Sequence, residues 1–298
     1  MPERAITDLT IADALDQAAG RLAPLGAAEP RREARALWAA VAGGNAGDVW
    51  LRRERSAPPD LVRRFRTAVD RRAGGIPFAY AAGWTPFRTV HLKIDQRALI
   101  PRPETEGLVD LVLRAMRETG NGNRETWGVA ADLGTGCGCI ALSLAVEGRF
   151  ERVLAVEHSA EAAALAVENV ALVDPPVPVD VRIGEWLAPL AGQRCRAIVS
   201  NPPYLTEAEY DELDPAVRLF EPRGALVSGG DGLDATAALL AGALPLLEPG
   251  GVVALEIDER RAEAVRALAR RHGWTTAAVH NDVFGRPRYL LARLEEGA

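Results

Sequence analysis

Lysine is almost absent from this chain, whose 35 basic residues include a single lysine, Lys93. Cysteine is also scarce, and its three residues fit neither a disulfide framework nor the spacing of a zinc site. No apolar run approaches the ~20 residues of a membrane-spanning helix, and residues 1–16 lack the apolar stretch of a signal peptide. These absences argue against a disulfide-stapled secreted protein and a membrane protein, so we expect a cytoplasmic chain without a metal centre.

The composition is that of a globular protein, with 48% hydrophobic and 26% charged residues among 298. At roughly 150 residues per domain, this length allows one large domain or two ordinary ones. The net charge of −6 is unevenly spread, because residues 1–100 hold 16 basic and 11 acidic side chains while residues 101–298 hold 19 and 30. Eleven arginines lie between Arg31 and Arg72, and they form either a solvated helical surface or a face that docks a partner.

Three patterns divide the chain. Residues 10–73 have the spacing of three short amphipathic helices, which predicts a small bundle. Residues 76–100 carry β-branched and aromatic residues between turn residues, which predicts a linker hairpin. From residue 101, strands and helices alternate, which predicts an α/β domain with a mostly parallel sheet covered on both faces. We therefore expect a helical domain at 1–75, a linker at 76–100 and an α/β domain at 101–298. The expected strands of the α/β domain are 128–132, 152–157, 178–183, 196–200, 251–257, 274–280 and 288–294.

A glycine-rich loop follows the first strand of the α/β domain and opens a helix. Glycines permit a close backbone approach, and the helix N-terminus adds exposed N–H groups. The loop lacks both the third glycine of the dinucleotide fingerprint, where Cys139 stands, and the lysine of a P-loop. What remains is D-x-G-x-G-x-G, the form used by S-adenosylmethionine-dependent methyltransferases. Asp132 can then bind the ammonium group of that cofactor, and Glu157, at the end of the next strand, its ribose hydroxyls. The loop residues expected to contact the cofactor are Gly134, Thr135, Gly136, Cys137 and Gly138.

The sequence Asn201-Pro202-Pro203-Tyr204 directly follows a strand, so it lies at the carboxyl edge of the sheet, where open α/β folds bind ligands. Its residues suit the task of holding a planar –NH2 group. The Asn201 carboxamide oxygen and the Pro202 carbonyl can each accept one amide hydrogen, the prolines stiffen the backbone, and Tyr204 offers an aromatic face. Two such acceptors aim the nitrogen lone pair at a sulfonium methyl group and stabilise the charge that develops on nitrogen.

With both elements in place, the chain resembles the HemK/PrmC family of protein-(glutamine-N5) methyltransferases. The resemblance covers almost the whole chain and implies a class I, Rossmann-like methyltransferase with a seven-stranded, mostly parallel sheet after a small helical bundle. It implies S-adenosyl-L-methionine as cofactor, S-adenosyl-L-homocysteine as product, and methylation of the Gly-Gly-Gln glutamine in class-I peptide chain release factors, which the helical domain would help to dock. The matching segments are 99–106, 132–138, 201–204, 220–222, 225–226, 230–233 and 255–257, with Asp282, Gly285 and Arg288.

The resemblance also assigns individual residues. It places Glu185 and Trp186 beside the adenine, the glycine loop, Glu157 and Asn201 at the cofactor, and residues 201–204 at the substrate. Glu221 is a candidate for a supporting role in the same site. The chain departs from the family pattern at four positions: Glu157 replaces the commoner Asp, Cys137 a Ser or Thr, Asp258 a glycine, and Arg261 lies near a usual glutamine.

Other interpretations of the same motifs stay open at this point. An adenine-N6 or cytosine-N4 nucleic-acid methyltransferase uses the same Asn-Pro-Pro-aromatic element, because an exocyclic amino group poses the same chemical problem. The acidic residues 101–298 disfavour a nucleic-acid partner. A paralogue that methylates another protein or a small molecule, and a silent cofactor-binding adaptor, are further alternatives. We expect a monomeric enzyme whose partner is a protein and which contacts no membrane.

Overall fold

The computed structural model describes residues 9–25, 29–118 and 126–295. Two compact units make up the chain. The first comprises residues 1–85, 94–96 and 215–220, and the second comprises 86–93, 97–214 and 221–298. The division falls inside the segment expected as a linker, and the domain limits at 75 and 100 stay a prediction. Within the described ranges, no helix combines the length and hydropathy needed to cross a bilayer.

The helical unit begins with α1, whose start at Thr10 was expected. The Thr10 hydroxyl accepts a hydrogen bond from the Asp13 amide at 3.1 Å, and the Asp13 carboxylate accepts one from the Thr10 amide at 3.1 Å, which forms a capping box. Trp38 and Phe65 meet edge to face, with 4.9 Å between ring centroids, in the core of the bundle. Its helices are α1 (Ile11–Leu22), α2 (Pro30–Ala42), α3 (Ala46–Leu51), α4 (Pro59–Ala73) and α5 (Phe78–Ala82).

The expectation of three helices in the bundle was incomplete. The six residues of α3 are too few to display a helical period, although Asn45 caps this helix by accepting from the Asp48 amide. α5 lies within residues 76–100, whose composition predicted a hairpin only. Several arginines of the basic segment are paired with acids on this unit. These pairs include Arg31 with Asp16 at 2.9 Å and Arg72 with Glu33 at 2.6 Å.

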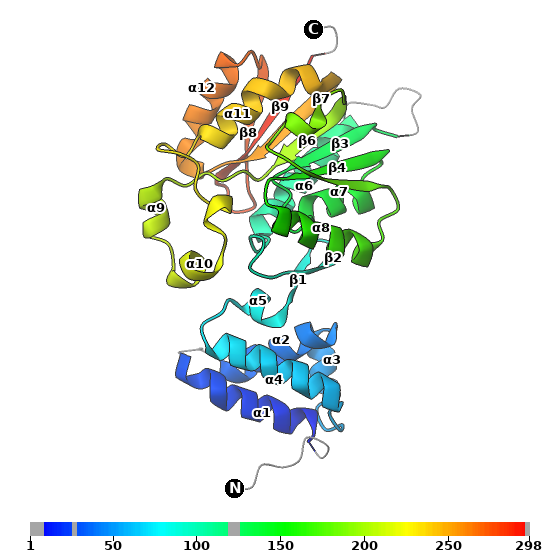
Figure 1. Cartoon of the computed structure of the whole chain (residues 1–298), viewed down its shortest axis with the longest axis vertical. Helices are drawn as coiled ribbons and strands as arrows, with labels where there is room; N and C mark the ends of the chain where they lie inside the picture. The colour runs from blue at the N-terminus through cyan, green and yellow to red at the C-terminus, as the bar shows by residue number, and fades with distance from the viewer. Residues whose placement is uncertain (1–8, 26–28, 119–125, 296–298) are drawn as a thin grey trace. The chain divides into compact units, whose positions relative to one another are not determined.

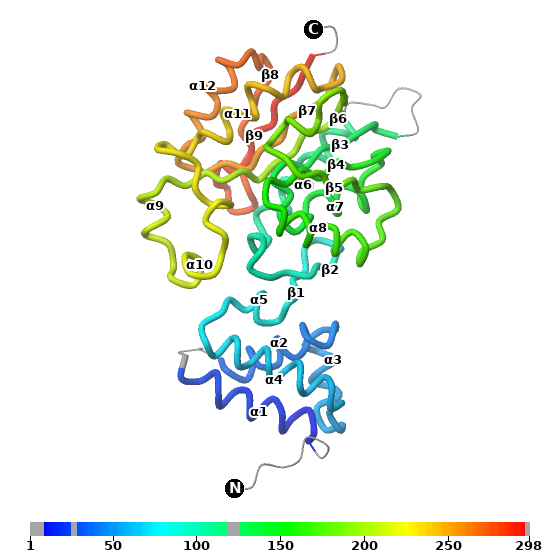
Figure 2. Tube along the Cα trace, in the orientation of Figure 1, coloured from blue at the N-terminus to red at the C-terminus, as the bar shows by residue number. Residues whose placement is uncertain are grey.

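The α/β unit is built on a seven-stranded sheet in the order β5-β4-β3-β6-β7-β9-β8 (Figure 1). Pairs among the first five strands of this order are parallel, and β9 is antiparallel to β7 and to β8, which confirms the mostly parallel sheet. The trace in Figure 2 runs outward from β3 to β5 and then returns to β6 beside β3. The strands are β3 (Val129–Leu133), β4 (Arg152–Glu157), β5 (Val179–Ile183), β6 (Cys195–Ser200), β7 (Leu247–Glu256), β8 (Thr276–Asn281) and β9 (Pro287–Arg293), and a separate two-stranded sheet pairs β1 (Trp84–Phe87) with β2 (Val90–Lys93).

Helices flank this sheet in two groups, and α6 packs on α7 while α11 packs on α12 (Figure 1). The buried core between the sheet and α11 and α12 includes Leu133, Ile198, Leu239 and Val265. The helices of this unit are α6 (Pro103–Glu118), α7 (Cys139–Glu147), α8 (Ala160–Val173), α9 (Glu207–Asp211), α11 (Asp234–Ala243) and α12 (Ala262–Arg271). The intervening α10 (Pro215–Phe220) belongs to the first unit.

α11 ends at Ala243, because Pro245 interrupts the helix and a short 3-10 turn, Leu244–Leu246, follows. The short helices α9 and α10 lie in a segment to which we assigned no element, and each has only five or six residues.

The reversal between β3 and β6 is the topological switch point, where open α/β sheets bind their ligands.

Candidate active site

A cavity of about 320 Å³ opens at this edge of the sheet, within the α/β unit. This volume lies at the lower end of the range of small-molecule sites. Loops that follow β3, β4, β5 and β6 all contribute to its wall. Of the residues expected at the site, the wall includes Gly134, Gly136, Glu157, Glu185, Trp186, Asn201 and Pro203. Leu99, Pro222 and Ala225, from segments that match the family, also line it. The wall further includes residues to which the sequence gave no role: Arg97, Ala98, His158, Ser159, Ala162, Gly184 and Gly224.

The glycine loop is held in shape by the neighbouring strand. The amides of Gly134 and Thr135 both donate to the Val156 carbonyl, at 2.9 and 3.0 Å. Gly134, Gly136 and Gly138 have φ angles of 69°, 56° and 88°, in the left-handed region that favours glycine. The backbone therefore turns sharply enough to present Gly134 and Gly136 to the cavity.

Asp132 lies behind this loop and is fully buried. Its Oδ2 accepts from the Thr135 hydroxyl at 2.6 Å and from the Ala141 amide at 3.0 Å, while its Oδ1 has no hydrogen bond partner. Burial raises the pKa of Asp132 to about 7, against the lowering effect of those two hydrogen bonds. Asp132 is absent from the cavity wall, and so are Thr135, Cys137 and Gly138, which shape the loop from behind.

Glu157 ends β4 and contacts the loop directly. Its Oε2 accepts from the Gly136 amide at 2.8 Å, and its Oε1 accepts from the Ser159 amide at 2.9 Å. Each carboxylate oxygen keeps a further lone pair. The side chain is thus fixed in one orientation beside the cavity and retains acceptor capacity for hydroxyl groups of a ligand.

Trp186 has an unusual backbone, with φ at 45°. A left-handed conformation is uncommon for a bulky residue and costs on the order of 1–3 kcal/mol, so the surrounding structure must impose it. The indole lines the cavity and packs on the large core of the unit. The cavity wall therefore includes a bulky residue that its surroundings hold in a strained backbone conformation.

The Asn-Pro-Pro-Tyr segment directly follows β6, so it lies on the other side of the glycine loop from Glu157. Just before it, the Ser200 hydroxyl donates to the Leu133 carbonyl at 2.6 Å, which ties the end of β6 to the end of β3. Asn201 and Pro203 line the cavity, whereas Pro202 is buried and Tyr204 is mostly buried. The Tyr204 amide donates to the Leu226 carbonyl at 3.2 Å, so this segment is also anchored beyond its prolines.

Glu221, which the sequence made a candidate for a supporting role, is buried behind the cavity wall. It is 5% exposed and accepts from the Ile100 amide at 3.2 Å and from the Arg102 guanidinium at 2.7 Å. The neighbouring Leu99 and Pro222 both line the cavity. Glu221 and Arg102 thus join the segment before α6 to the segment that carries Pro222.

Known proteins share both parts of this architecture. Residues 13–83 match the family described as the PrmC N-terminal domain, and residues 110–233 match the family described as the methyltransferase small domain. A protein of Moorella thermoacetica named release factor glutamine methyltransferase is 39% identical over 97% of this chain and 100% of its own length. Proteins of the same name from Cereibacter sphaeroides (37% identical; 95% of this chain, 98% of the relative) and Deinococcus radiodurans (38%; 97% and 100%) also match.

The chain belongs to the release factor glutamine methyltransferase family. It is an S-adenosylmethionine-dependent methyltransferase with the class I fold. Among solved structures, the human Mettl16 catalytic domain in complex with a MAT2A 3'UTR hairpin superposes with a TM-score of 0.54 at 17% identity, over 78% of this chain and 80% of the other. At that identity the likeness concerns the fold alone.

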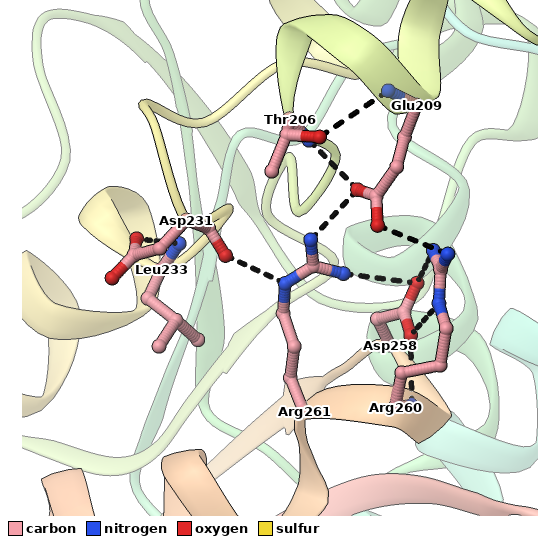
Figure 3. A network of polar contacts seen from close by, with 7 residues as sticks. All are labelled: Thr206, Glu209, Asp231, Leu233, Asp258, Arg260 and Arg261. Carbon is pink, nitrogen blue, oxygen red and sulfur yellow. Dashed lines mark hydrogen bonds and ion pairs between the residues drawn. The ribbon is translucent and has the colours of Figure 1, made fainter.

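Asp258 and Arg261, two of the positions at which a departure from the family pattern was expected, belong to one polar network (Figure 3). Arg261 donates to the Glu209 carboxylate of α9 at 2.7 Å and to the Asp231 carbonyl at 2.7 Å, and it lies 3.3 Å from the Asp258 carboxylate. Arg260 bridges the same two carboxylates, at 2.6 Å to Asp258 and 3.0 Å to Glu209. Arg261 therefore ties α9 and the loop around Asp231 to the end of β7.

Replacing Arg261 by glutamine should lower the free energy of unfolding by about 2 kcal/mol, because the largely buried carboxylates of Glu209 and Asp258 lose a charged donor. The control is Arg266→Gln in α12, the helix that begins directly after Arg261; its ion pair with Glu263 is exposed, with an expected loss of at most ~0.5 kcal/mol. Thermal melting followed by circular dichroism measures both changes. Equal melting temperatures for the two variants would contradict a structural role for the network.

Proposed function

We propose that this methyltransferase transfers a methyl group to the glutamine side chain of the Gly-Gly-Gln tripeptide in class-I peptide chain release factors, and that it does so in the cytoplasm, where translation terminates. The observation that carries the proposal is that Asn201 and Pro203 share one cavity wall with Gly134, Gly136 and Glu157. An amide-holding segment thus faces a cofactor-type loop across a small space. The names of relatives that match over nearly their whole length support the substrate.

The residues present fit S-adenosylmethionine. The turned backbone at Gly134 and Gly136 leaves room for the methionine part, and the fixed carboxylate of Glu157 suits two ribose hydroxyls. Trp186, with Glu185 beside it, would pack on the adenine. Asp132 lies buried behind the loop, and the charge of its carboxylate would favour the ammonium group without direct contact. When bound, the cofactor supplies an electrophilic methyl group and leaves as S-adenosylhomocysteine.

Asn201 and Pro202 would bind and orient the substrate amide. The Asn201 carboxamide oxygen accepts one hydrogen of the glutamine amide and the Pro202 carbonyl accepts the other, which directs the nitrogen lone pair at the methyl carbon. A carbon–nitrogen bond forms as the carbon–sulfur bond breaks, and the same two acceptors stabilise the positive charge on nitrogen until a proton leaves. Burial raises the pKa of the Tyr204 phenol well above its usual value, so Tyr204 serves as a neutral aromatic surface rather than as a base.

The substrate class is tested by competition. A purified class-I release factor and an adenine- and cytosine-containing oligonucleotide are incubated together with the enzyme and S-adenosylmethionine labelled in its methyl group. Label is expected in the protein and none in the oligonucleotide. Label in the oligonucleotide alone would contradict the proposal and favour the nucleic-acid alternative.

Cofactor affinity should depend on pH through Asp132. Because its pKa is raised to about 7, the free enzyme holds Asp132 largely protonated at pH 6 and ionised at pH 8. A positive ammonium group on the cavity side of the loop favours the ionised form of Asp132 by its charge, so binding should release a proton at pH 6 and tighten roughly tenfold between pH 6 and pH 8. Calorimetric titration with S-adenosylhomocysteine measures the effect. The control Asp132→Asn should bind more weakly and show a flat profile, and a flat profile in the wild type would refute the role.

A further inference from the structure

Thr105 and Glu256 lie next to Asn201 and belong to two motifs that the proposed reaction leaves unused. Asn201 Nδ2 donates to Thr105 Oγ1 at 3.1 Å, and Thr105 Oγ1 donates to Glu256 Oε2 at 2.7 Å. Both Thr105, in the first turn of α6, and Glu256, the last residue of β7, are 2% exposed. A chain of three polar groups therefore runs from the buried end of β7 to the cavity wall.

The direction of these hydrogen bonds follows from the chemistry of the groups. Burial raises the pKa of Glu256 to about 7, so above that pH the side chain is a carboxylate. A threonine hydroxyl has one hydrogen, and the Glu256 carboxylate can only accept it. Thr105 Oγ1 is then left as an acceptor toward Asn201, so the Asn201 carboxamide must present its NH2 group to Thr105. Its oxygen is thereby turned away from Thr105, and the residue lines the cavity.

This orientation decides what the site can hold. With its oxygen toward the cavity, Asn201 accepts a hydrogen from a substrate –NH2 group. In the flipped orientation it would present two N–H donors to a group that is itself a donor, and the contact would be lost. A free asparagine side chain has no strong preference between the two states, so an external partner must select one.

Other contacts fix the start of α6 where Thr105 can reach. The Tyr289 hydroxyl, on β9 beside Glu256, donates to the Glu104 carbonyl at 2.6 Å. Gly107 makes room for that ring, because a Cβ at position 107 would lie 2.9 Å from Tyr289 Cζ. The helix turn that carries Thr105 is therefore held against the two strands β7 and β9.

We propose that Thr105 and Glu256 are positioning residues that hold the Asn201 carboxamide with its oxygen toward the substrate amide. This inference rests on the proposed function, in which Asn201 accepts a hydrogen from the glutamine side chain. Glu256 acts through Thr105, and Thr105 acts through Asn201. Neither touches the reacting atoms.

The test compares Thr105→Val, which has the same shape but no hydroxyl, with Thr105→Ser, which keeps the hydroxyl. Turnover is measured at saturating cofactor on a release factor, and cofactor affinity by calorimetry. Thr105→Val should lower kcat about 30- to 100-fold with cofactor Kd within about twofold, while Thr105→Ser should stay within about threefold of the wild type. Equal kcat losses in the two variants, or none in Thr105→Val, would overturn the proposal.

A second readout does not depend on the substrate. The chain has six asparagines, so labelling with [15N]asparagine gives few side-chain amide signals, and the Asn201 signal is the one missing from Asn201→Ala. That signal should shift in Thr105→Val and stay in place in Thr105→Ser. An unmoved signal in Thr105→Val would overturn the positioning role of Thr105. Both outcomes can be read even if the wild-type enzyme fails to methylate a release factor, and a shifted signal would then still support the role.

Discussion

Replacing Asn201 by alanine should lower the rate of methyl transfer about 10³-fold or more, because the substrate amide loses the acceptor that orients its hydrogens and stabilises charge on nitrogen. The cofactor affinity should change by less than tenfold, roughly 1.4 kcal/mol, since the glycine loop and Glu157 are untouched. Single-turnover transfer of labelled methyl gives the rate, and calorimetry gives the affinity.

The matched control is Asn281→Ala, which removes the same side chain from the exposed end of β8 and should leave both quantities unchanged. Wild-type turnover by Asn201→Ala would remove Asn201 from the mechanism. A large loss of cofactor affinity would instead make it chiefly a cofactor ligand.

Replacing Gly136 by valine should abolish measurable cofactor binding, with a loss of at least about 100-fold in affinity. Gly136 has φ at 56°, where a β-branched residue is strained, so the loop must leave its present course. A Cβ there would lie 3.8 Å from Ala98 Cβ, an ordinary contact, so backbone strain at the cavity wall causes the effect rather than a clash within the protein. Calorimetric titration with S-adenosylhomocysteine is the measurement.

Gly192→Val separates this local effect from general destabilisation. Gly192 also has a positive φ, at 75°, with open space where a Cβ would lie, and it is not part of the cavity wall. Its valine variant should lose a similar amount of stability and bind the cofactor normally. Normal binding by Gly136→Val would contradict the assignment of the loop.

The sequence predicted that these motifs would meet at one edge of the sheet, for a physical reason. Strands of a parallel sheet end at a common edge, so a glycine loop after β3, an acid after β4 and an amide-holding segment after β6 had to meet there. Gly134, Glu157 and Asn201 accordingly line one cavity. The D-x-G-x-G-x-G spacing did not indicate which loop residues face the cavity, because Thr135, Cys137 and Gly138 were expected at the cofactor and are absent from the wall.

The features that the sequence could not predict depend on contacts between residues that are far apart along the chain. Thr105 lies 96 positions before Asn201 and 151 before Glu256, and no local pattern links them. The motifs containing Thr105 and Glu256 were visible, but their shared role required the packing of α6 on β7. The burial of Asp132 behind the loop and the left-handed backbone of Trp186 were likewise beyond local reasoning.

In the proposed reaction, the side-chain nitrogen of one particular glutamine receives the methyl group. A class-I release factor is incubated with the enzyme and S-adenosylmethionine, digested, and mapped by tandem mass spectrometry, beside a variant in which the Gly-Gly-Gln glutamine is alanine. We expect a single added methyl on the side-chain nitrogen of that glutamine and no methylation of the variant. Methylation of the variant, or a methyl group on any other residue, would contradict it.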